Sequence, residues 1–374
     1  MKRILHISKY YYPFLGGIEQ IARDCVNVLK DEYEQMVIAF SENEKDENTV
    51  VDGVTVYKCG CRKKIASQPI SYTYKRRLKK VINDFKPNIV VFHYPNPFVA
   101  CILLPLIEKN NIKLVTYWHC DIVKQKIIGK FFIGQNKKIL KMSTKIIVTS
   151  PNYIEGSDWL KYVKEKCCII PNCINTERMR VTPKIEKMAE EIRKKNENKV
   201  ICLAVGRHTK YKGFEYLIKA SKLLPNNYTI YIAGTGELTN KLHKEAEGDS
   251  KICFTGRVDD DKLKALLLAC DIFCFPSITK NEAFGVALAE AMYYGKPAVT
   301  FTIPGSGVNY VCINGETGIE CENGNSKEFA KAIKRLGYNN EIRTTYGRAS
   351  RQRIIHNFIQ EIYKLHVIRL FENL

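Results

Sequence analysis

Two glutamates, Glu282 and Glu290, stand eight positions apart where an apolar strand gives way to a helix. The run IFCF (272–275) predicts the strand, and the first turn of the helix carries Gly285. A helix N-terminus offers unpaired N–H groups and partial positive charge, and therefore suits phosphate. A carboxylate beside it, followed by a glycine that lets a ligand approach the backbone, indicates a sugar phosphate site. In the alternative interpretation, which the pair alone favours, Glu282 complements the helix dipole and Glu290 is solvated.

Other residues with useful chemistry also follow apolar, strand-like runs. In chain order they are Gly16, Gly17, His119, Arg207, Lys212, Gly234, Arg257 and Val258. Open parallel sheets bind ligands beyond the carboxyl ends of their strands, so these turns are where a site is expected. Each residue also has an ordinary explanation: the glycines form plain turns, the cations are solvated, and the histidine is satisfied at a strand end. Because all of these residues fall in turns that follow a strand, the sequence favours a ligand-binding site.

The elements that would position these residues are two rounds of alternating strand and helix. Apolar runs in the first half are RILHIS, QMVIAF, VTVYKC, NIVVFH, KLVTYWH and KIIVTS, and those in the second are VICLAVG, YTIYIAG, ICFTG, IFCFPS and PAVTF. Such short runs between amphipathic helices predict parallel sheets covered on both faces. A chain of 374 residues fits two domains. We expect an α/β protein with two Rossmann-like domains, residues 1–181 and 182–353, whose parallel sheets face an interdomain cleft. The charged segment 182–199 marks the connection or a surface helix beside it.

The composition and the distribution of apolar residues indicate the cellular compartment of the protein. The longest apolar run, 98–107, is about half of the roughly 20 residues of a membrane span, and the N-terminus lacks the apolar core of a signal peptide. Many of the 14 cysteines lie inside apolar patterns, and none form a CxxC pair. We therefore expect a cytoplasmic protein.

The net charge of +20 predicts anionic partners. In the segment 74–85, Tyr74, Leu78, Ile82 and Phe85 form one helical stripe, with basic residues around it. A second basic segment, 122–142, mixes lysines with isoleucines and aromatic residues. Either one suits an anionic membrane surface, although ordinary packing helices with solvated basic faces are commoner. No zinc finger or RNP-type motif accompanies the charge, which argues against nucleic acid.

Several segments together resemble retaining glycosyltransferases of family 4, in the order in which that family has them. They are GGIEQIA (16–22), the histidine of YWHCDIVKQK, GRHTKYKGFEYLIKA (206–220), AGTGEL, GRVDDDKLKALLLACDIFCFPS, EAFGVALAEAMYYGKPAV (282–299) and NGETG. The two glutamates match the family's E-x7-E signature. The resemblance implies the GT-B fold and a C-terminal helix, about 354–374, that packs back on an acceptor-binding N-terminal domain. The second domain would bind the nucleotide sugar.

The resemblance also implies roles for single residues. Arg207 and Lys212 would hold the donor diphosphate, Glu282 the donor sugar hydroxyls and Glu290 the ribose. His119 would reach the donor sugar, and Gly16 and Gly17 would close over the phosphates. The remaining donor contacts would come from Gly234, Phe284, Gly285 and Val286, with Arg257 and Val258 at the base.

Asp259, Asp260 and Asp261 superficially match a metal-binding DxD motif. They directly precede an apolar helical run, where aspartates cap helices, so we assign them as a cap. The resemblance likewise implies no metal and no cofactor beside the donor. One departure is IPNCIN, where Cys173 and Asn175 replace the usual glycine and aspartate.

The expected function is transfer of a hexose or N-acetylhexosamine from a UDP- or GDP-sugar. The acceptor would be a lipid-linked glycan, or more generally a glycan or polyprenyl-linked acceptor, in bacterial surface polysaccharide synthesis (lipopolysaccharide, capsule or exopolysaccharide). Two segments, HCDIVKQK and FPSITKNEAFG, are loosely similar to mannosyltransferases. A soluble transferase acting on sugar phosphates or small metabolites is the alternative enzyme. A catalytically silent sugar-nucleotide-binding module is the alternative of another class.

Overall fold

The computed structural model describes residues 1–14, 16–65, 68–122 and 126–374, and the side chains of 126–131 lie outside this description. The chain divides into two compact units. Unit 1 comprises Met1–Thr149, Ser157–Pro171 and Tyr363–Leu374, and unit 2 comprises Ser150–Gly156 and Asn172–Ile362. The predicted basic segment 122–142 falls partly outside the described residues.

Unit 1 is built on an eight-stranded sheet in the order β10-β9-β8-β7-β1-β2-β4-β3. All neighbours pair in parallel except β3, which is antiparallel to β4 at one edge. The strands are β1 (Arg3–Ile7), β2 (Glu34–Phe40), β3 (Glu47–Val51), β4 (Val54–Cys59), β7 (Ile89–Tyr94), β8 (Lys113–Trp118), β9 (Ser143–Val148) and β10 (Cys167–Ile169). The short strands β5 (Lys63–Ile65) and β6 (Gln68–Ile70) form a separate pair.

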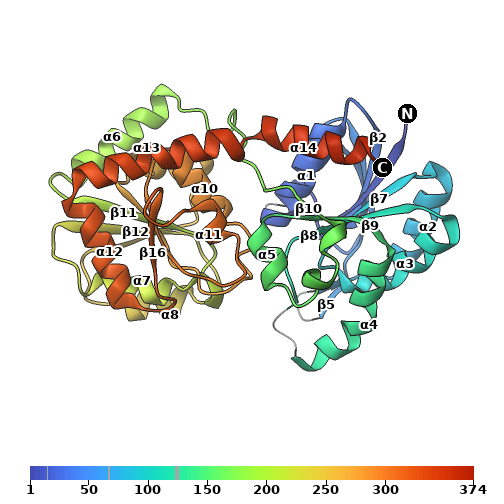
Figure 1. The fold of residues 1–374 in the computed structure, drawn as a ribbon, viewed down its shortest axis with the longest axis horizontal. Helices are drawn as coiled ribbons and strands as arrows, with labels where there is room; N and C mark the ends of the chain where they lie inside the picture. Colours follow the sequence, from blue (N-terminus) through green and yellow to red (C-terminus); the bar gives the residue numbers. More distant parts are fainter. Residues whose placement is uncertain (15, 66–67, 123–125) are drawn as a thin grey trace. The chain divides into compact units, whose positions relative to one another are not determined.

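Helices cover both faces of this sheet (Figure 1). On one face, α1 (Gly17–Leu29) packs near the part of α14 (Gln360–Glu372) that belongs to unit 1, and the ring of Phe371 meets Tyr33 at 6.1 Å. On the other face lie α2 (Tyr74–Phe85), α3 (Pro97–Asn110) and α4 (Lys126–Met142), each packed on the next. The apolar stripe predicted for α2 is confirmed, because Tyr74, Leu78, Ile82 and Phe85 are all buried.

Unit 2 has a six-stranded, fully parallel sheet in the order β13-β12-β11-β14-β15-β16. The strands are β11 (Val200–Val205), β12 (Tyr228–Ala233), β13 (Ile252–Gly256), β14 (Ile272–Phe275), β15 (Ala298–Phe301) and β16 (Gly318–Cys321). Every residue of β12, β14 and β15 is buried, as expected for strands covered on both faces. The predicted α/β class with two parallel sheets is confirmed.

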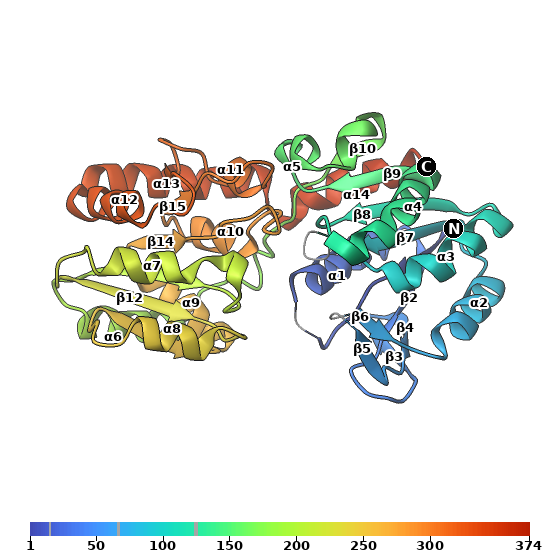
Figure 2. The same ribbon diagram turned by 90° about the horizontal axis from the view of Figure 1, so that it is seen from below.

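Two sets of helices sandwich this second sheet. In Figures 1 and 2, α6 (Pro183–Lys195), α9 (Asp260–Ala269), α10 (Val286–Tyr293) and α13 (Asn340–Asn357) lie on one face. The other face carries α7 (Phe214–Ser221), α8 (Thr239–Glu245) and α12 (Ser326–Tyr338). The chain builds outward from β11 in one direction and from β14 in the other, so these neighbouring strands mark the topological switch point. Two short helices, α5 (Pro151–Gly156) and α11 (Val308–Val311), complete the unit.

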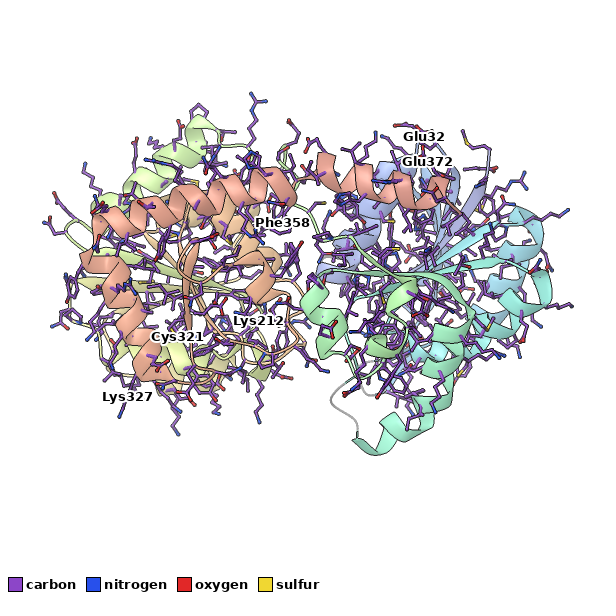
Figure 3. The ribbon with its side chains drawn as sticks, viewed as in Figure 1. Glu32, Lys212, Cys321, Lys327, Phe358 and Glu372 are labelled. Atoms are coloured by element: carbon purple, nitrogen blue, oxygen red, sulfur yellow. The ribbon has the colours of Figure 1, made fainter. Side chains whose placement is uncertain are left out.

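The helix expected across 354–374 is interrupted. Helix α13 ends at Asn357 and α14 begins at Gln360. Between them the amide of Ile174 donates to the carbonyl of Phe358 at 2.7 Å, and the amide of Gln360 donates to the carbonyl of Ile174 at 3.1 Å. Phe358, labelled in Figure 3, is buried against Phe284. The break therefore follows from pairing with a segment far away in the sequence, which no helical pattern reveals.

Candidate functional site

The strongest candidate site lies at the carboxyl ends of β11 and β14, the switch point of unit 2. The loop after β11 carries Arg207 and Lys212, and the loop after β14 carries Glu282. The ammonium group of Lys212 donates a hydrogen bond to Oε2 of Glu282. Arg207 is exposed beside them, whereas only 12% of each paired side chain is exposed. The structure therefore brings together two of the residues predicted to grip the donor and leaves the third facing solvent.

Glycines allow these loops to approach closely. Gly213 has a φ of 63°, and a Cβ there would lie 2.1 Å from the carbonyl oxygen of Pro276. The loop after β12 is equally tight, because a Cβ on Gly234 would lie 2.0 Å from the carbonyl oxygen of Gly206. No other residue fits at such distances. Gly234 was predicted from its position after a strand, and its close packing against the Arg207 loop is consistent with a place in the same site.

Lys212, labelled in Figure 3, has an aromatic neighbour beside its ammonium group. Its Nζ lies 4.9 Å from the centre of the Phe275 ring. Burial alone would lower the pKa of Lys212, but the charge of Glu282 and its hydrogen bond raise that pKa above the usual value. The lysine is therefore a preformed cation in a site from which much of the water is excluded.

Glu282 is fixed from several directions. The hydroxyl of Ser277 donates to its Oε2 at 3.3 Å, and the hydroxyl of Ser306 donates to its main-chain oxygen. Ser306 comes from the loop after β15, which had not been predicted to contribute. The carboxylate therefore has a defined position before any ligand is bound.

Helix α10 begins directly after Gly285, which has a φ of 90°. Phe284 is only 2% exposed and packs into the core, so its main chain rather than its ring is available to a ligand. Val286 is the first helical residue and is partly buried. This geometry places the free N–H groups of a helix start next to Glu282, as the sequence predicted.

Glu290 lies on α10 with its side chain 8% exposed, so the alternative of a solvated helix residue is wrong. Its Oε1 accepts a hydrogen bond from Nη1 of Arg178 at 3.0 Å. Burial raises the pKa of Glu290, and the charge of Arg178 opposes that rise. The guanidinium of Arg178 also binds Asp260 at 2.7 Å. Arg178 was missed by sequence reasoning, because no motif marks it.

The predicted helix cap is confirmed. Asp259 precedes α9, and its side chain accepts from the amide of Lys262 at 2.8 Å. Asp260 pairs with Arg178, and Asp261 pairs with Lys184 at 2.8 Å. Within the described ranges, no group of three or more His, Cys, Asp or Glu side chains could hold a metal ion. Metal-independent catalysis stays a prediction.

Arg257 and Val258 follow β13, two strands away from β11 in the sheet order. Arg257 is exposed, and Val258 packs partly against the core. The main-chain N–H of Gly234 donates to the carbonyl of Gly256 at 2.8 Å, which ties this turn to the one after β12. Their proposed contact with a nucleotide base stays a prediction.

Gly16, Gly17 and His119 belong to unit 1. Gly17 begins α1 after β1, and a Cβ there would meet nothing within 4 Å. A Cβ on Gly16, by contrast, would lie 2.2 Å from the carboxylate of Glu19. The open space at Gly17 is compatible with an anion at the helix start. Whether these residues join the donor site of unit 2 stays a prediction.

His119 follows β8 and is 5% exposed. Its Nε2 shares a hydrogen bond of 2.9 Å with Nδ1 of His93, and its ring stacks on Tyr117 at 4.5 Å. Burial lowers the pKa of His119 to about 3, so the ring is neutral at physiological pH. One ring nitrogen is thus already engaged, and a role toward the donor would fall to the other nitrogen or to the main chain.

The two doubly wound sheets form the GT-B fold, and comparisons with known proteins identify the class of protein as a glycosyltransferase. The family pattern described as "Glycosyl transferases group 1" matches residues 186–353, and that described as "Glycosyltransferase Family 4" matches residues 15–178. The chain belongs to glycosyltransferase family 4.

Curated relatives match along most of their length. The chain is 29% identical to O-antigen chain mannosyltransferase C of Escherichia coli over 381 residues, covering 100% of the chain and 97% of that protein. It is also 29% identical to D-rhamnosyltransferase WbpZ of Pseudomonas aeruginosa, with 89% of the chain and 86% of the relative covered.

Solved structures share the fold. Sucrose-phosphate synthase of Thermosynechococcus elongatus superposes with a TM-score of 0.84 at 18% identity, covering 100% of this chain and 99% of that one. HepE of Anabaena, solved with UDP and glucose, gives a TM-score of 0.80 at 16% identity and 100% coverage of both chains. At these identities the likeness concerns the fold alone.

Proposed function

We propose that this glycosyltransferase moves a hexose or N-acetylhexosamine from a UDP- or GDP-sugar to a glycan acceptor with retention of configuration. The acceptor is a lipid-linked glycan, and the product is part of a bacterial surface polysaccharide. The observation that carries the donor half of this proposal is the Lys212 and Glu282 pair beside Arg207 at the switch point of unit 2. The mannosyl- and rhamnosyltransferase relatives support the acceptor half, and mannose is the first donor sugar to test.

The cations suit the chemistry of a leaving nucleoside diphosphate. When the bond between sugar and phosphate breaks, negative charge grows on the leaving group, and fixed cations stabilise it more than they stabilise the bound donor. Lys212 is positioned and charged before binding. Arg207 faces solvent and offers a planar pair of donors to an arriving diphosphate.

The carboxylates divide the rest of the donor. Glu282 binds the hydroxyls of the transferred sugar, and binding exchanges part of its contact with Lys212 for these hydroxyls. Glu290, held by Arg178, accepts from the ribose. The free N–H groups at the start of α10 face the phosphate, and the turns at Gly234, Arg257 and Val258 border the base.

Transfer then proceeds by same-face substitution through an oxocarbenium-like state, without a metal. An oxygen of the departing phosphate takes the proton of the acceptor hydroxyl, because no described carboxylate other than the engaged Glu282 stands at this loop as a nucleophile. We also propose that His119 contacts the donor sugar and that Gly16 and Gly17 contact the donor phosphates.

The setting is the cytoplasmic face of the cell membrane. No helix among the described residues is long and apolar enough to cross a bilayer. Helix α2 exposes Lys75, Arg76, Lys79 and Lys80 while burying its apolar stripe, and this basic face is suited to anionic lipid headgroups. Co-sedimentation with anionic vesicles tests the contact, and the absence of binding at low salt would exclude it.

A panel of UDP-, GDP- and ADP-sugars, tested for binding and slow hydrolysis, tests the proposed function without knowledge of the acceptor. One UDP- or GDP-sugar is expected to bind and to be hydrolysed slowly, with the anomeric configuration kept. If no sugar nucleotide binds while the protein is folded, the proposal fails, and so does the alternative of a silent sugar-nucleotide-binding module.

Arg178 provides a separate prediction about the part of the site that is proposed to bind the ribose of the nucleotide. Arg178→Met should weaken nucleoside diphosphate binding by about 10-fold, because a buried carboxylate loses its charged partner. The pKa of Glu290, already raised by burial, would rise further in this variant. When the pH is lowered, Glu290 should therefore be protonated, and nucleotide affinity lost, at a higher pH than in the unmodified protein. Titrations of UDP and GDP at several pH values measure both effects.

Arg180→Met is the matched control, because Arg180 is exposed two residues away. Equal affinities for the Arg178 and Arg180 variants at every pH would show that Arg178 does not support nucleotide binding.

A further inference from the structure

A pocket of about 320 Å³ in unit 2 carries several positive side chains on its walls. Five cationic residues contribute to it, namely Arg193, Lys296, Arg343, Arg348 and Arg351. Asp271 is the one carboxylate among the lining residues of the described chain. The walls of this pocket therefore carry a formal charge of +4, the five cations less Asp271.

The pocket is separate from the candidate donor site. Asp271 directly precedes β14, and Lys296 and Pro297 directly precede β15, so the pocket opens at the amino ends of these strands. Glu282, in contrast, follows the carboxyl end of β14. The two sites thus lie at opposite ends of one sheet, and the proposed transfer reaction does not use the pocket.

Neutral partners fix several of these cations in place. Nη1 of Arg343 donates to the carbonyls of Leu336 and Gly337, both at 2.9 Å, where α12 ends. Arg351 donates to the carbonyl of Tyr293 at 3.1 Å, and Lys296 donates to that of Leu268 at 2.9 Å. These carbonyls orient the cationic side chains, which complement the partial negative charge at the helix ends, but the carbonyls carry no net charge to cancel that of the cations.

The carboxylate of Asp271, the one negative charge among the described residues that line the pocket, is already shared. Asp271 accepts from Arg193 at 2.9 Å and from the amide of Ile201 at 2.8 Å. The side chain of Arg348, on α13, is exposed and makes no hydrogen bond or ion pair with the described residues. Burial lowers the pKa of Lys296, and the charge of Arg193 acts in the same direction. The cations repel one another, and an anion between them would relieve that repulsion.

We propose that this pocket binds a small phosphate-bearing anion. Guanidinium groups match phosphate oxygens with paired hydrogen bonds, and a concave wall of one charge raises the local concentration of such ligands. The volume admits a diphosphate or a sugar phosphate. The same chemistry is offered by a free metabolite and by a lipid phosphate headgroup, and the experiment separates these two sources.

The probes are inorganic pyrophosphate, followed by calorimetry at low salt, and vesicles containing phosphatidic acid, followed by flotation. Wild-type protein should bind two pyrophosphates, one in the donor site and one in the pocket. Arg348→Glu should weaken one of these sites by about 10-fold or more, because it replaces an attractive charge by a repulsive one. Arg207→Ala should weaken pyrophosphate binding at the donor site. If it does not, the proposed donor site is contradicted, but the proposed pocket is not.

Lys331→Glu on α12 is the matched control, because it makes the same charge change at an exposed position outside the pocket. Melting temperatures of both variants show whether they fold. If vesicle binding, but not pyrophosphate binding, depends on Arg348, the ligand is a lipid phosphate. If Arg348→Glu behaves like Lys331→Glu toward both probes, the pocket does not bind phosphate.

Discussion

Lys212→Ala is expected to lower kcat by about 100-fold or more, which is the usual cost of removing one preorganised group that stabilises developing charge. The effect should be this large because the ammonium group is fixed beside Glu282 and is only 12% exposed, where its field is weakly screened. Arg207→Ala should act in the same direction from the solvent side. Rates of donor hydrolysis or transfer under saturating donor measure both effects.

Lys210→Ala is the control for the lysine, since Lys210 is exposed in the same loop. It should keep turnover near that of the unmodified enzyme. A Lys212→Ala enzyme that folds and works at the normal rate would rule out the diphosphate role. The melting temperature should be recorded, because the substitution leaves Glu282 without its cationic partner.

Glu282→Ala is expected to abolish sugar transfer while sparing much of the affinity for the nucleoside diphosphate. The carboxylate is proposed to hold only the sugar, so product nucleotide should bind almost as before. A pH effect should accompany the loss. The charge of Glu282 raises the pKa of Lys212 against the influence of burial, so without it that pKa falls. Binding of the diphosphate needs the charged lysine. When the pH is raised, the variant should therefore lose this binding at a lower pH than the unmodified protein does.

Glu290→Gln is the informative comparison for Glu282. It should weaken nucleotide binding, because its proposed partner is the ribose, which the product retains. Calorimetric titration with UDP and GDP separates the two variants. Equal loss of nucleotide affinity and transfer in Glu282→Ala would indicate a damaged fold instead of a missing sugar contact.

Local patterns in the sequence sufficed for much of the fold. Strands β11 to β15 of unit 2 and the cap at Asp259 were predicted because apolar runs and helix starts depend on nearby residues. Strand β3, with the sequence ENTVV, was missed because it is an edge strand with a half-exposed pattern. The short strand β10, CCI, is too brief to form a pattern.

The candidate site was harder to predict in full. Glu282 and Lys212 could be found because family motifs and strand ends mark them. Arg178 could not, since its partners Asp260 and Glu290 lie 82 and 112 residues further along the chain. The contact of His119 with His93 spans 26 residues and depends on the pairing of β7 with β8. Such contacts follow from tertiary packing and have no local signature.

The division of the chain into units has a consequence for how the protein is made. Unit 2 includes Ser150–Gly156, where Gly156 packs so tightly on Gly305 that a Cβ would lie 2.1 Å from its Cα. Unit 1 includes Tyr363–Leu374, which the ribosome makes only after all of unit 2. Neither unit is therefore one continuous stretch, and cutting the gene between residues 171 and 172 would give two incomplete halves. During synthesis, the first unit must wait for its last helix until the second has been translated.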